Sequence, residues 1–181
     1  MDNNQVYIKQ FKLRCALQLI SFIYTMKTEK EIIKYYQYFW KNKHSYLFMM
    51  IKLFYLLFLS SFHTIGKILL KRYMVIFIVF NNNKITGLAH MEFSSSQRYQ
   101  NSLLGIVINK DLFGTSIGRK LMQVCIDYCI NNNKRKIELD VFRDNVRAIS
   151  FYKKIGFTTI NTTDIKGNIY HMELDLLALL C

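Results

Sequence analysis

The chain contains no proline, only 7 glycines, and only 12 acidic residues against 25 lysines and arginines. The resulting charge of +13 favours contact with phosphates, acidic substrates, anionic lipid or nucleic acid, without selecting among them. The missing proline accompanies an abundance of Asn, Lys, Ile, Tyr and Phe, and we interpret this pattern as a compositional bias that raises lysine content by itself. The basic residues are scattered, with short clusters at Lys71-Arg72 and Lys134–Lys136. We therefore expect no specific nucleic-acid partner.

Cysteine is also scarce. The cysteines are Cys15, Cys125, Cys129 and Cys181, with no CxxC pair and no His-x-x-x-His partner. This spacing indicates neither a zinc site nor a disulfide framework, so we expect no metal and a reducing compartment. Cys125 and Cys129 fall on one expected helix at a spacing that suits small core residues. Residues 1–5 lack the features of a secretory signal, and we expect a cytoplasmic protein.

One long hydrophobic run raises the question of a membrane. Residues 46–62 read YLFMMIKLFYLLFLSSF and are interrupted by Lys52. The uninterrupted apolar part is shorter than the roughly 20 residues that span a bilayer, and a lysine near the middle would be costly there. We expect a buried or interfacial helix, and a peripheral membrane contact stays open.

Hydrophobic periodicity predicts an alternation of strands and helices. Strands are expected at 5–11, 74–80, 85–93, 102–108, 136–142, 157–161 and 169–176, and helices at 13–26, 28–40, 116–130 and 145–155. Turns are expected at the Asn-rich stretches 81–84 and 131–133 and at Gly156. The strands on either side of 81–84, and the last two strands, are expected to form antiparallel hairpins.

A candidate anion site lies in the segment Leu104–Leu121, LGIVINKDLFGTSIGRKL. Here a strand leads into a glycine-containing loop that opens a helix. Unpaired backbone N–H groups and the positive end of a helix dipole meet at such a point, which suits a diphosphate. The spacing matches neither the Walker pattern nor the GxGxxG dinucleotide pattern. Taken alone, the segment fits a plain strand-to-helix turn equally well.

A second motif makes the pattern more specific. The spacing Asn-x-x-Ala-x-x-x-Tyr-x-x-x-Gly-Phe is met by Asn145, Ala148, Tyr152, Gly156 and Phe157. Together with the loop, this segment resembles the GNAT superfamily of acyl-CoA-dependent N-acyltransferases, and the resemblance covers about residues 74–176. It implies that acetyl-CoA is the acyl donor and that a primary amine is the acceptor. It implies direct transfer in a ternary complex, without an acyl-cysteine.

The loop departs from the family motif at two positions. The motif Arg/Gln-x-x-Gly-x-Gly/Ala falls on residues 113–118, where Phe113 replaces the basic or amide residue and Ser116 replaces the first glycine. Because main-chain N–H groups hold a diphosphate, the site can survive both changes, although Ser116 could weaken cofactor affinity. The residues that the resemblance implies at the cofactor are Ile106, Val107, Ile108, Phe113, Gly114, Thr115, Ser116, Ile117, Gly118, Arg119, Asn145, Ala148 and Tyr152.

The catalytic residues follow from the same resemblance. It implies that Tyr152 protonates the departing sulfur as general acid; a plain core aromatic is the alternative for this side chain. The strand at 102–108 carries no carboxylate, so Glu92 and His90 on the neighbouring strand are the candidates for the general base. They share a face by period two, and a chain of waters could carry the proton instead.

Three other titratable residues in the core segment receive no catalytic role. We interpret Asp140 and Asp144 as cofactor-side or surface charges, and His171 as a surface residue of the final strand.

The expected fold is a single α/β domain with a mixed, mostly antiparallel sheet. The resemblance implies a splay between strands 102–108 and 136–142, with helices on both faces. Residues 1–73 would form the substrate side, 74–176 the acyl-CoA-binding core and 177–181 a tail. We expect an N-acetyltransferase, monomeric or homodimeric, whose amine the sequence does not identify. A non-catalytic acyl-CoA-binding or membrane-associated module is the alternative.

Overall fold

The computed structural model describes residues 6–26, 72–94, 101–162 and 168–179. Its strands are β1 (Val6–Gln10), β2 (Arg72–Asn81), β3 (Lys84–Ser94), β4 (Asn101–Ile108), β5 (Lys136–Phe142), β6 (Thr158–Thr162) and β7 (Ile169–Asp175). Its α-helices are α1 (Ala16–Met26), α5 (Ile117–Asn131) and α6 (Val146–Ile155), and short 3-10 turns lie at Leu13–Cys15, Lys110–Leu112 and Leu177–Leu179. The predicted elements within these ranges are confirmed. The predicted helix at 28–40 and the apolar run 46–62 lie outside the described residues.

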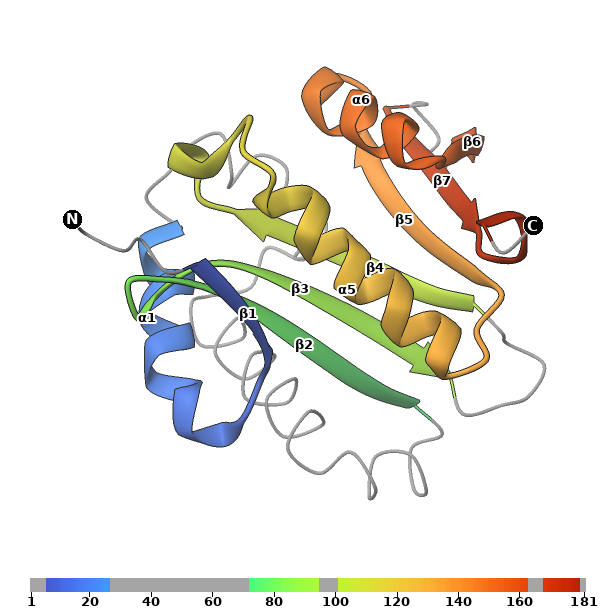
Figure 1. Cartoon of the computed structure of the whole chain (residues 1–181). Coiled ribbons are helices and arrows are strands. Elements are labelled where there is room, and N and C mark those ends of the chain that lie inside the picture. Colours follow the sequence, from blue (N-terminus) through green and yellow to red (C-terminus); the bar gives the residue numbers. More distant parts are fainter. Residues whose placement is uncertain (1–5, 27–71, 95–100, 163–167, 180–181) are drawn as a thin grey trace, which may run out of the picture.

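The strands form one sheet in the order β1-β2-β3-β4-β5-β7-β6 (Figure 1). Only β4 and β5 are parallel; every other neighbouring pair is antiparallel. The parallel pairing is short and comprises Asn101–Lys136, Ser102–Ile137 and Leu103–Glu138. Beyond these pairs β4 stays with β3 and β5 stays with β7, so the two central strands separate. The predicted mixed sheet and its splay are therefore confirmed.

Helices cover both faces of the sheet, as predicted. One face, called the α5 face here, packs against α5 and α6 around a core that includes Val75, Met91 and Leu139. The opposite face, the α1 face, packs against α1 around Ile76 and Leu88. Because side chains alternate along a strand, β2 contributes buried residues to both cores. In Figure 1, α5 lies in front of the sheet, where it contacts β2, β3 and β5, and α6 lies beside β5.

The two cysteines of helix α5 are poorly suited to act as nucleophiles. Cys125 and Cys129 are fully buried on its core-facing side, which confirms their prediction as small core residues. Burial raises the pKa of the Cys129 thiol to about 11 and that of Cys125 further still. A buried, protonated thiol is a poor nucleophile.

Within the described ranges, asparagine and glycine each take the left-handed conformation at two places in the chain. Asn82 and Asn83 adopt φ of 48° and 60° between β2 and β3, and Asn133 adopts 54° after α5. Consecutive left-handed residues are the hairpin geometry that asparagine tolerates best after glycine. Gly156 ends α6 at φ 114°, as predicted. This glycine-poor chain thus uses asparagine at two of these places and keeps glycine at the other two.

None of the helices in the four described ranges combines the length and hydropathy that a bilayer span requires.

The core assignment is testable at α5. Leu121 is completely buried, whereas Leu17 on α1 is 82 % exposed. Leu121→Ala should lower the free energy of unfolding by about 2–5 kcal/mol, because it removes apolar contacts and leaves a cavity. Leu17→Ala is the control and should stay within about 0.5 kcal/mol of the parent. Urea denaturation measures both; equal losses would contradict this packing.

Candidate active site

The site begins where β4 and β5 part. The β4 backbone beyond Leu103 has no register partner on β5, although it stays paired with β3 as far as Ile108. The two sides of this gap are called its banks: one is β4 with the loop that follows it, and the other is β5 with α6. The predicted pantetheine contacts Ile106, Val107 and Ile108 lie on the β4 bank. The side chains of Ile106 and Ile108 pack on the α5-face core, so their backbone groups, not their side chains, are available to the gap. An open strand edge of this kind can bind an extended ligand as an added strand.

The loop after β4 is built to expose backbone N–H groups. Gly114 has φ 77°, a conformation that other residues rarely adopt, and no atom lies within 4 Å of where its Cβ would be. The Thr115 hydroxyl donates to the Leu112 carbonyl at 2.6 Å, which closes the turn. Ser116 is the N-cap of α5, but its side chain makes no capping hydrogen bond. The first-turn N–H groups, including those of Gly118 and Arg119, have no acceptor within the helix.

A cation reaches this loop from another element. The Arg147 guanidinium, on α6, lies 3.4 Å from the centroid of the Phe113 ring. Arginine stacks well on aromatic faces, where the ring quadrupole attracts its charge. The loop follows β4 and α6 follows β5, so this contact joins the two banks of the gap. The position that lacks the family's basic residue is thus next to a basic side chain after all.

Helix α6 holds its predicted residues in one arrangement. Asn145 caps the helix, with Oδ1 accepting from the Ala148 backbone N–H at 3.3 Å. Ala148 packs against the α5-face core, and Tyr152 is buried within it. The Tyr152 ring contacts Phe151 and Phe157 at centroid distances of 5.5 and 5.6 Å. The cap explains the asparagine locally, and the aromatic contacts fix the tyrosine ring on the α5 face beside β5.

On the α1 face, the gap opens between Gly105 and Asp140. Each is two residues beyond the last β4–β5 pair, Leu103–Glu138. His90, opposite Gly105 on β3, lies over this glycine so closely that a Cβ there would be 2.0 Å from the imidazole Cε1. Gly105 therefore makes room for the ring at the edge of the gap.

Glu92 lies on the same face as His90, in agreement with the predicted period of two. It is exposed and pairs with Leu103, at the closed end of the splay. His90 is the candidate nearer to the gap by register. The proposed roles of Glu92 and Tyr152 stay predictions.

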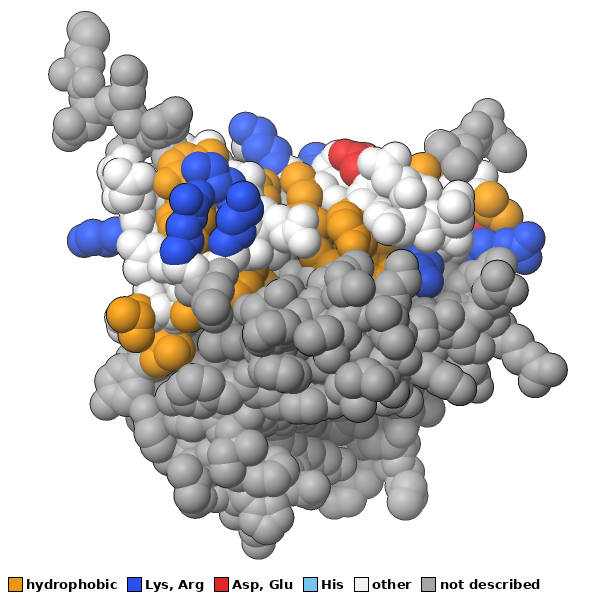
Figure 2. Space-filling model, turned by 90° about the horizontal axis from the view of Figure 1, so that it is seen from below, with side chains coloured by type: hydrophobic (Ala, Val, Ile, Leu, Met, Phe, Trp, Pro, Cys, Tyr) orange, Lys and Arg blue, Asp and Glu red, His pale blue; other side chains and the backbone are white. Residues whose placement is uncertain are grey.

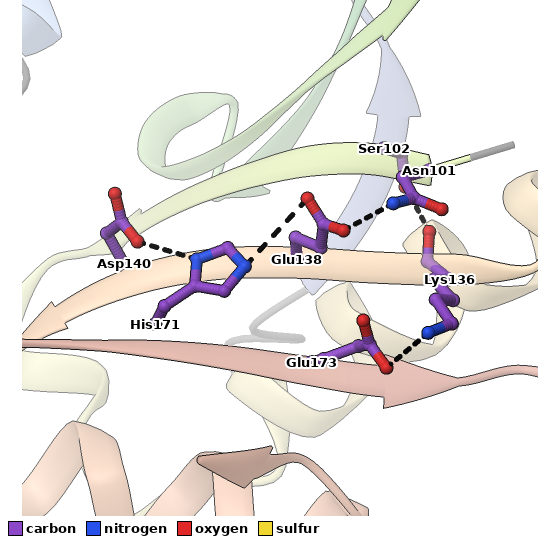
Figure 3. Close-up of polar contacts among 7 residues, drawn as sticks. All are labelled: Asn101, Ser102, Lys136, Glu138, Asp140, His171 and Glu173. Carbon is purple, nitrogen blue, oxygen red and sulfur yellow. Dashed lines mark hydrogen bonds and ion pairs between the residues drawn. The ribbon is translucent and has the colours of Figure 1, made fainter. Parts of the chain in front are cut away.

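Sequence reasoning missed a polar cluster on β5 and β7 (Figure 3). Asp140 was expected at the cofactor side or the surface, but its Oδ1 lies 2.9 Å from Nδ1 of His171. The other ring nitrogen, Nε2, lies 3.9 Å from Oε2 of Glu138. Glu138 Oε1 accepts a hydrogen bond from the Asn101 side-chain amide of β4. The three titratable side chains are only 21–23 % exposed.

The sequence contained only part of the pattern that produces this cluster. Glu138 and Asp140, and likewise His171 and Glu173, alternate with buried residues on their strands. Alternation places each pair on one face, but only the β5–β7 register, with Asp140 opposite His171, brings the pairs together. Within the described ranges no group of three such side chains has the arrangement of a metal site.

Among the described residues, the basic side chains visible in Figure 2 lie in several separate places, between apolar and neutral side chains.

Comparison with known proteins agrees with this architecture. A sequence model described as "Acetyltransferase (GNAT) family" matches residues 36–157. The match begins further upstream than the resemblance found by motif. A stretch of 59 residues is 32 % identical to the uncharacterized N-acetyltransferase YobR of Bacillus subtilis, covering 33 % of this chain and 24 % of that protein. The matched part therefore spans about a quarter of that relative.

Solved structures share the fold over nearly the whole chain. Spermidine N-acetyltransferase from Vibrio cholerae, in complex with CoA and spermine, has a TM-score of 0.69 at 18 % identity and covers 98 % of this chain and 99 % of that one. The GNAT domain of S. lividans PAT has a TM-score of 0.71 at 12 % identity and covers 96 % and 92 %. PaiA N-acetyltransferase from Thermoplasma acidophilum, in complex with coenzyme A, has 0.64 at 15 % and covers 94 % and 99 %.

These identities are low, so the structural likeness concerns the fold, while the sequence match identifies the family. The splayed sheet and the loop that opens helix α5 are consistent with the family match over residues 36–157. This chain belongs to the acetyltransferase (GNAT) family of acyltransferase enzymes.

Proposed function

We propose that this protein transfers an acetyl group from acetyl-CoA to a primary amine by direct transfer in a ternary complex. The observation that carries the proposal is the gap between β4 and β5, which opens beside the uncapped start of α5. Two solved relatives of the same fold are described as complexes with coenzyme A, and one of them also contains spermine. Polyamines are therefore the first amines to test.

Donor binding would use the two banks of the gap. The N–H groups at the start of α5 suit the diphosphate, and the β4 edge at 106–108 suits the pantetheine arm. Arg147 would add a positive charge where Phe113 removes one from the loop. Acetyl-CoA supplies the thioester carbonyl and a thiolate leaving group. Oriented backbone N–H groups near such a carbonyl stabilise the charge that develops on its oxygen.

Tyr152 is the proposed general acid. It stands on α6, on the α5 face beside β5, and a phenol keeps its proton at neutral pH. The amine would approach from the α1 face, where the polar cluster lies. We propose that residues 1–73 contribute to this substrate side, because α1 packs on this face.

A non-catalytic acyl-CoA-binding module is the second candidate. The departures at Phe113 and Ser116 favour it, because both change the loop that holds the donor. It predicts donor binding without turnover, whereas the enzyme predicts both.

The first test is a thiol-release assay with acetyl-CoA and a panel of amines. The panel contains spermidine, spermine, lysine, a peptide with a free amino terminus and an aminoglycoside. We expect thiol release that depends on one class of amine, with the N-acetyl product confirmed by mass spectrometry. Binding of acetyl-CoA in a thermal-shift experiment, without turnover on any amine, would support the module.

Replacing Tyr152 tests the general acid. Tyr152→Phe should lower kcat by about 10²-fold or more, because positioned proton donors contribute at least that much. The dissociation constant for acetyl-CoA should change little, because the ring and its packing remain. Tyr128→Phe, the same change in a core-facing tyrosine of α5, is the matched control and should leave kcat unchanged. A Tyr152→Phe enzyme with parental kcat would remove Tyr152 from this role.

Replacing Arg147 tests whether its guanidinium supplies the positive charge that the loop lacks at Phe113. Arg147→Gln should weaken CoA binding about 3- to 10-fold, the range of one charge-assisted contact, and reduce its dependence on salt. Lys153→Gln, on the exposed side of the same helix, is the control and should have little effect. Isothermal titration calorimetry measures both. Tighter CoA binding by Arg147→Gln would instead mean that the guanidinium blocks the mouth of the gap.

A further inference from the structure

We propose that His171, oriented by Asp140, is the general base that takes a proton from the substrate ammonium, and that Glu138 holds this ammonium beside it. The proposal rests on the proposed amine acetylation and adds the residues that receive the acceptor. It concerns the α1 face of the splay, opposite the side of β5 on which Tyr152 is buried.

The position of the cluster follows from the sheet register. Asp140 is the first β5 residue on the α1 face beyond the last β4–β5 pair, and His171 is its partner on β7. Leu139 and Val141 point into the α5-face core, so Glu138 and Asp140 point to the α1 face. The cluster therefore borders the gap on the side away from the α5 helix, where an acceptor can meet a donor bound between the strands.

The geometry of the imidazole suits a base. Its Nδ1 lies 2.9 Å from Asp140 Oδ1, and a carboxylate in this position accepts a hydrogen bond from Nδ1–H. The lone pair of a neutral ring is then on Nε2, the nitrogen that points toward Glu138. The 3.9 Å between Nε2 and Glu138 Oε2 is too long for a hydrogen bond, but both atoms can contact one N–H donor between them.

Glu138 is fixed in place by its other oxygen. Oε1 accepts from the Asn101 amide, at the closed end of the β4–β5 pair, which leaves Oε2 toward the imidazole. Glu173, the next acidic residue on this face, is already paired with Lys136 at 2.7 Å. Glu138 and Asp140 thus give this spot a negative charge on a chain whose formal charge is +13. Partial burial strengthens the attraction of such a carboxylate for an ammonium.

Among the described residues, the charged side chains on this face near the imidazole come from two strands. They are Asp140, Glu138 and Lys136 on β5 and Glu173, the partner of Lys136, on β7, while β6 places the neutral Asn161 opposite His171.

The proposed proton transfers balance with the bond changes. One N–H bond of the ammonium breaks, and its proton goes to Nε2 of His171. The electron pair left on nitrogen attacks the thioester carbon, so that a C–N bond forms and the C–S bond breaks. The sulfur takes the phenol proton of Tyr152, and a second amine proton returns to that phenolate through solvent. The imidazolium then releases its proton, so each turnover yields amide, free CoA thiol and one proton.

The variants separate the two banks of the gap. His171→Gln should lower kcat/KM about 10²-fold or more, because the general base is lost. His90→Gln, the same change on β3, tests the rival candidate for the general base and should lower kcat/KM much less than His171→Gln does. Acetyl-CoA affinity should be unchanged in both. A large loss in His90→Gln with a near-parental His171→Gln would overturn the proposal.

The pH profile excludes a merely structural role. Without a base, turnover depends on amine that is already neutral, so kcat/KM for His171→Gln should keep rising toward the pKa of the amine, about 10.4 for a lysine side chain. Asp140→Asn should fall between parent and His171→Gln. If kcat/KM of His171→Gln keeps the parental pH dependence and is only lower at every pH, the proposal is overturned.

Two further measurements guard against misfolding. His171→Ala should regain activity with added imidazole, which a collapsed site would not allow. Glu138→Gln should raise KM for the amine about 10-fold while changing kcat little, as expected for one lost contact to a charged group. Failure of both predictions would overturn the proposal.

The proposed function itself is checked first with the parent protein. A parent that releases no thiol with any amine of the panel overturns both proposals. An active parent with an active His171→Gln variant overturns the base alone.

Discussion

The separation of β4 from β5 after Leu103 is the constraint on which the rest of the molecule depends. A parallel pair between antiparallel neighbours can open because β3 and β7 satisfy the outer edges of both strands. The opening is held by packing at its mouth: a Cβ on Gly118 would lie 3.4 Å from Ile108 and 3.5 Å from Phe151. Strand β4, helix α5 and helix α6 therefore meet around this glycine, where an added methyl group would make ordinary van der Waals contacts with side chains of β4 and α6.

Local chemistry made most of the fold predictable. The alternation in 136–142, the helical spacing from Leu121 to Cys129 and the Asn-rich turn at 81–84 each specify a local conformation, and the structure contains all of them. The gap was predicted only through resemblance, because no local pattern states where two strands stop pairing. The Asp140–His171 contact was missed because register depends on the whole sheet and not on either strand.

The difference between a local sequence pattern and the assembled structure also explains why the contact of Arg147 was not predicted. Read along the chain, Phe113 is a loss of charge from the first position of the loop motif. In space, the guanidinium that stacks on its ring comes from the helix on the other bank. A motif describes one segment, whereas a bound anion experiences every charge within a Debye length, about 8 Å at physiological salt. Departures from a motif therefore need to be judged on the assembled site.

The splay also gives a physical reason for placing two proton-transfer groups on opposite faces. In the proposed reaction the phenol gives its proton to the sulfur and the imidazole takes a proton from the ammonium, so the two groups must meet different atoms of the reacting centre. Tyr152 is packed among aromatic rings on the α5 face, and His171 lies between carboxylates on the α1 face, with β5 between them. In the proposed reaction, a thioester in the gap is the point that both groups can reach, so the sheet itself keeps acid and base apart until the substrates join them.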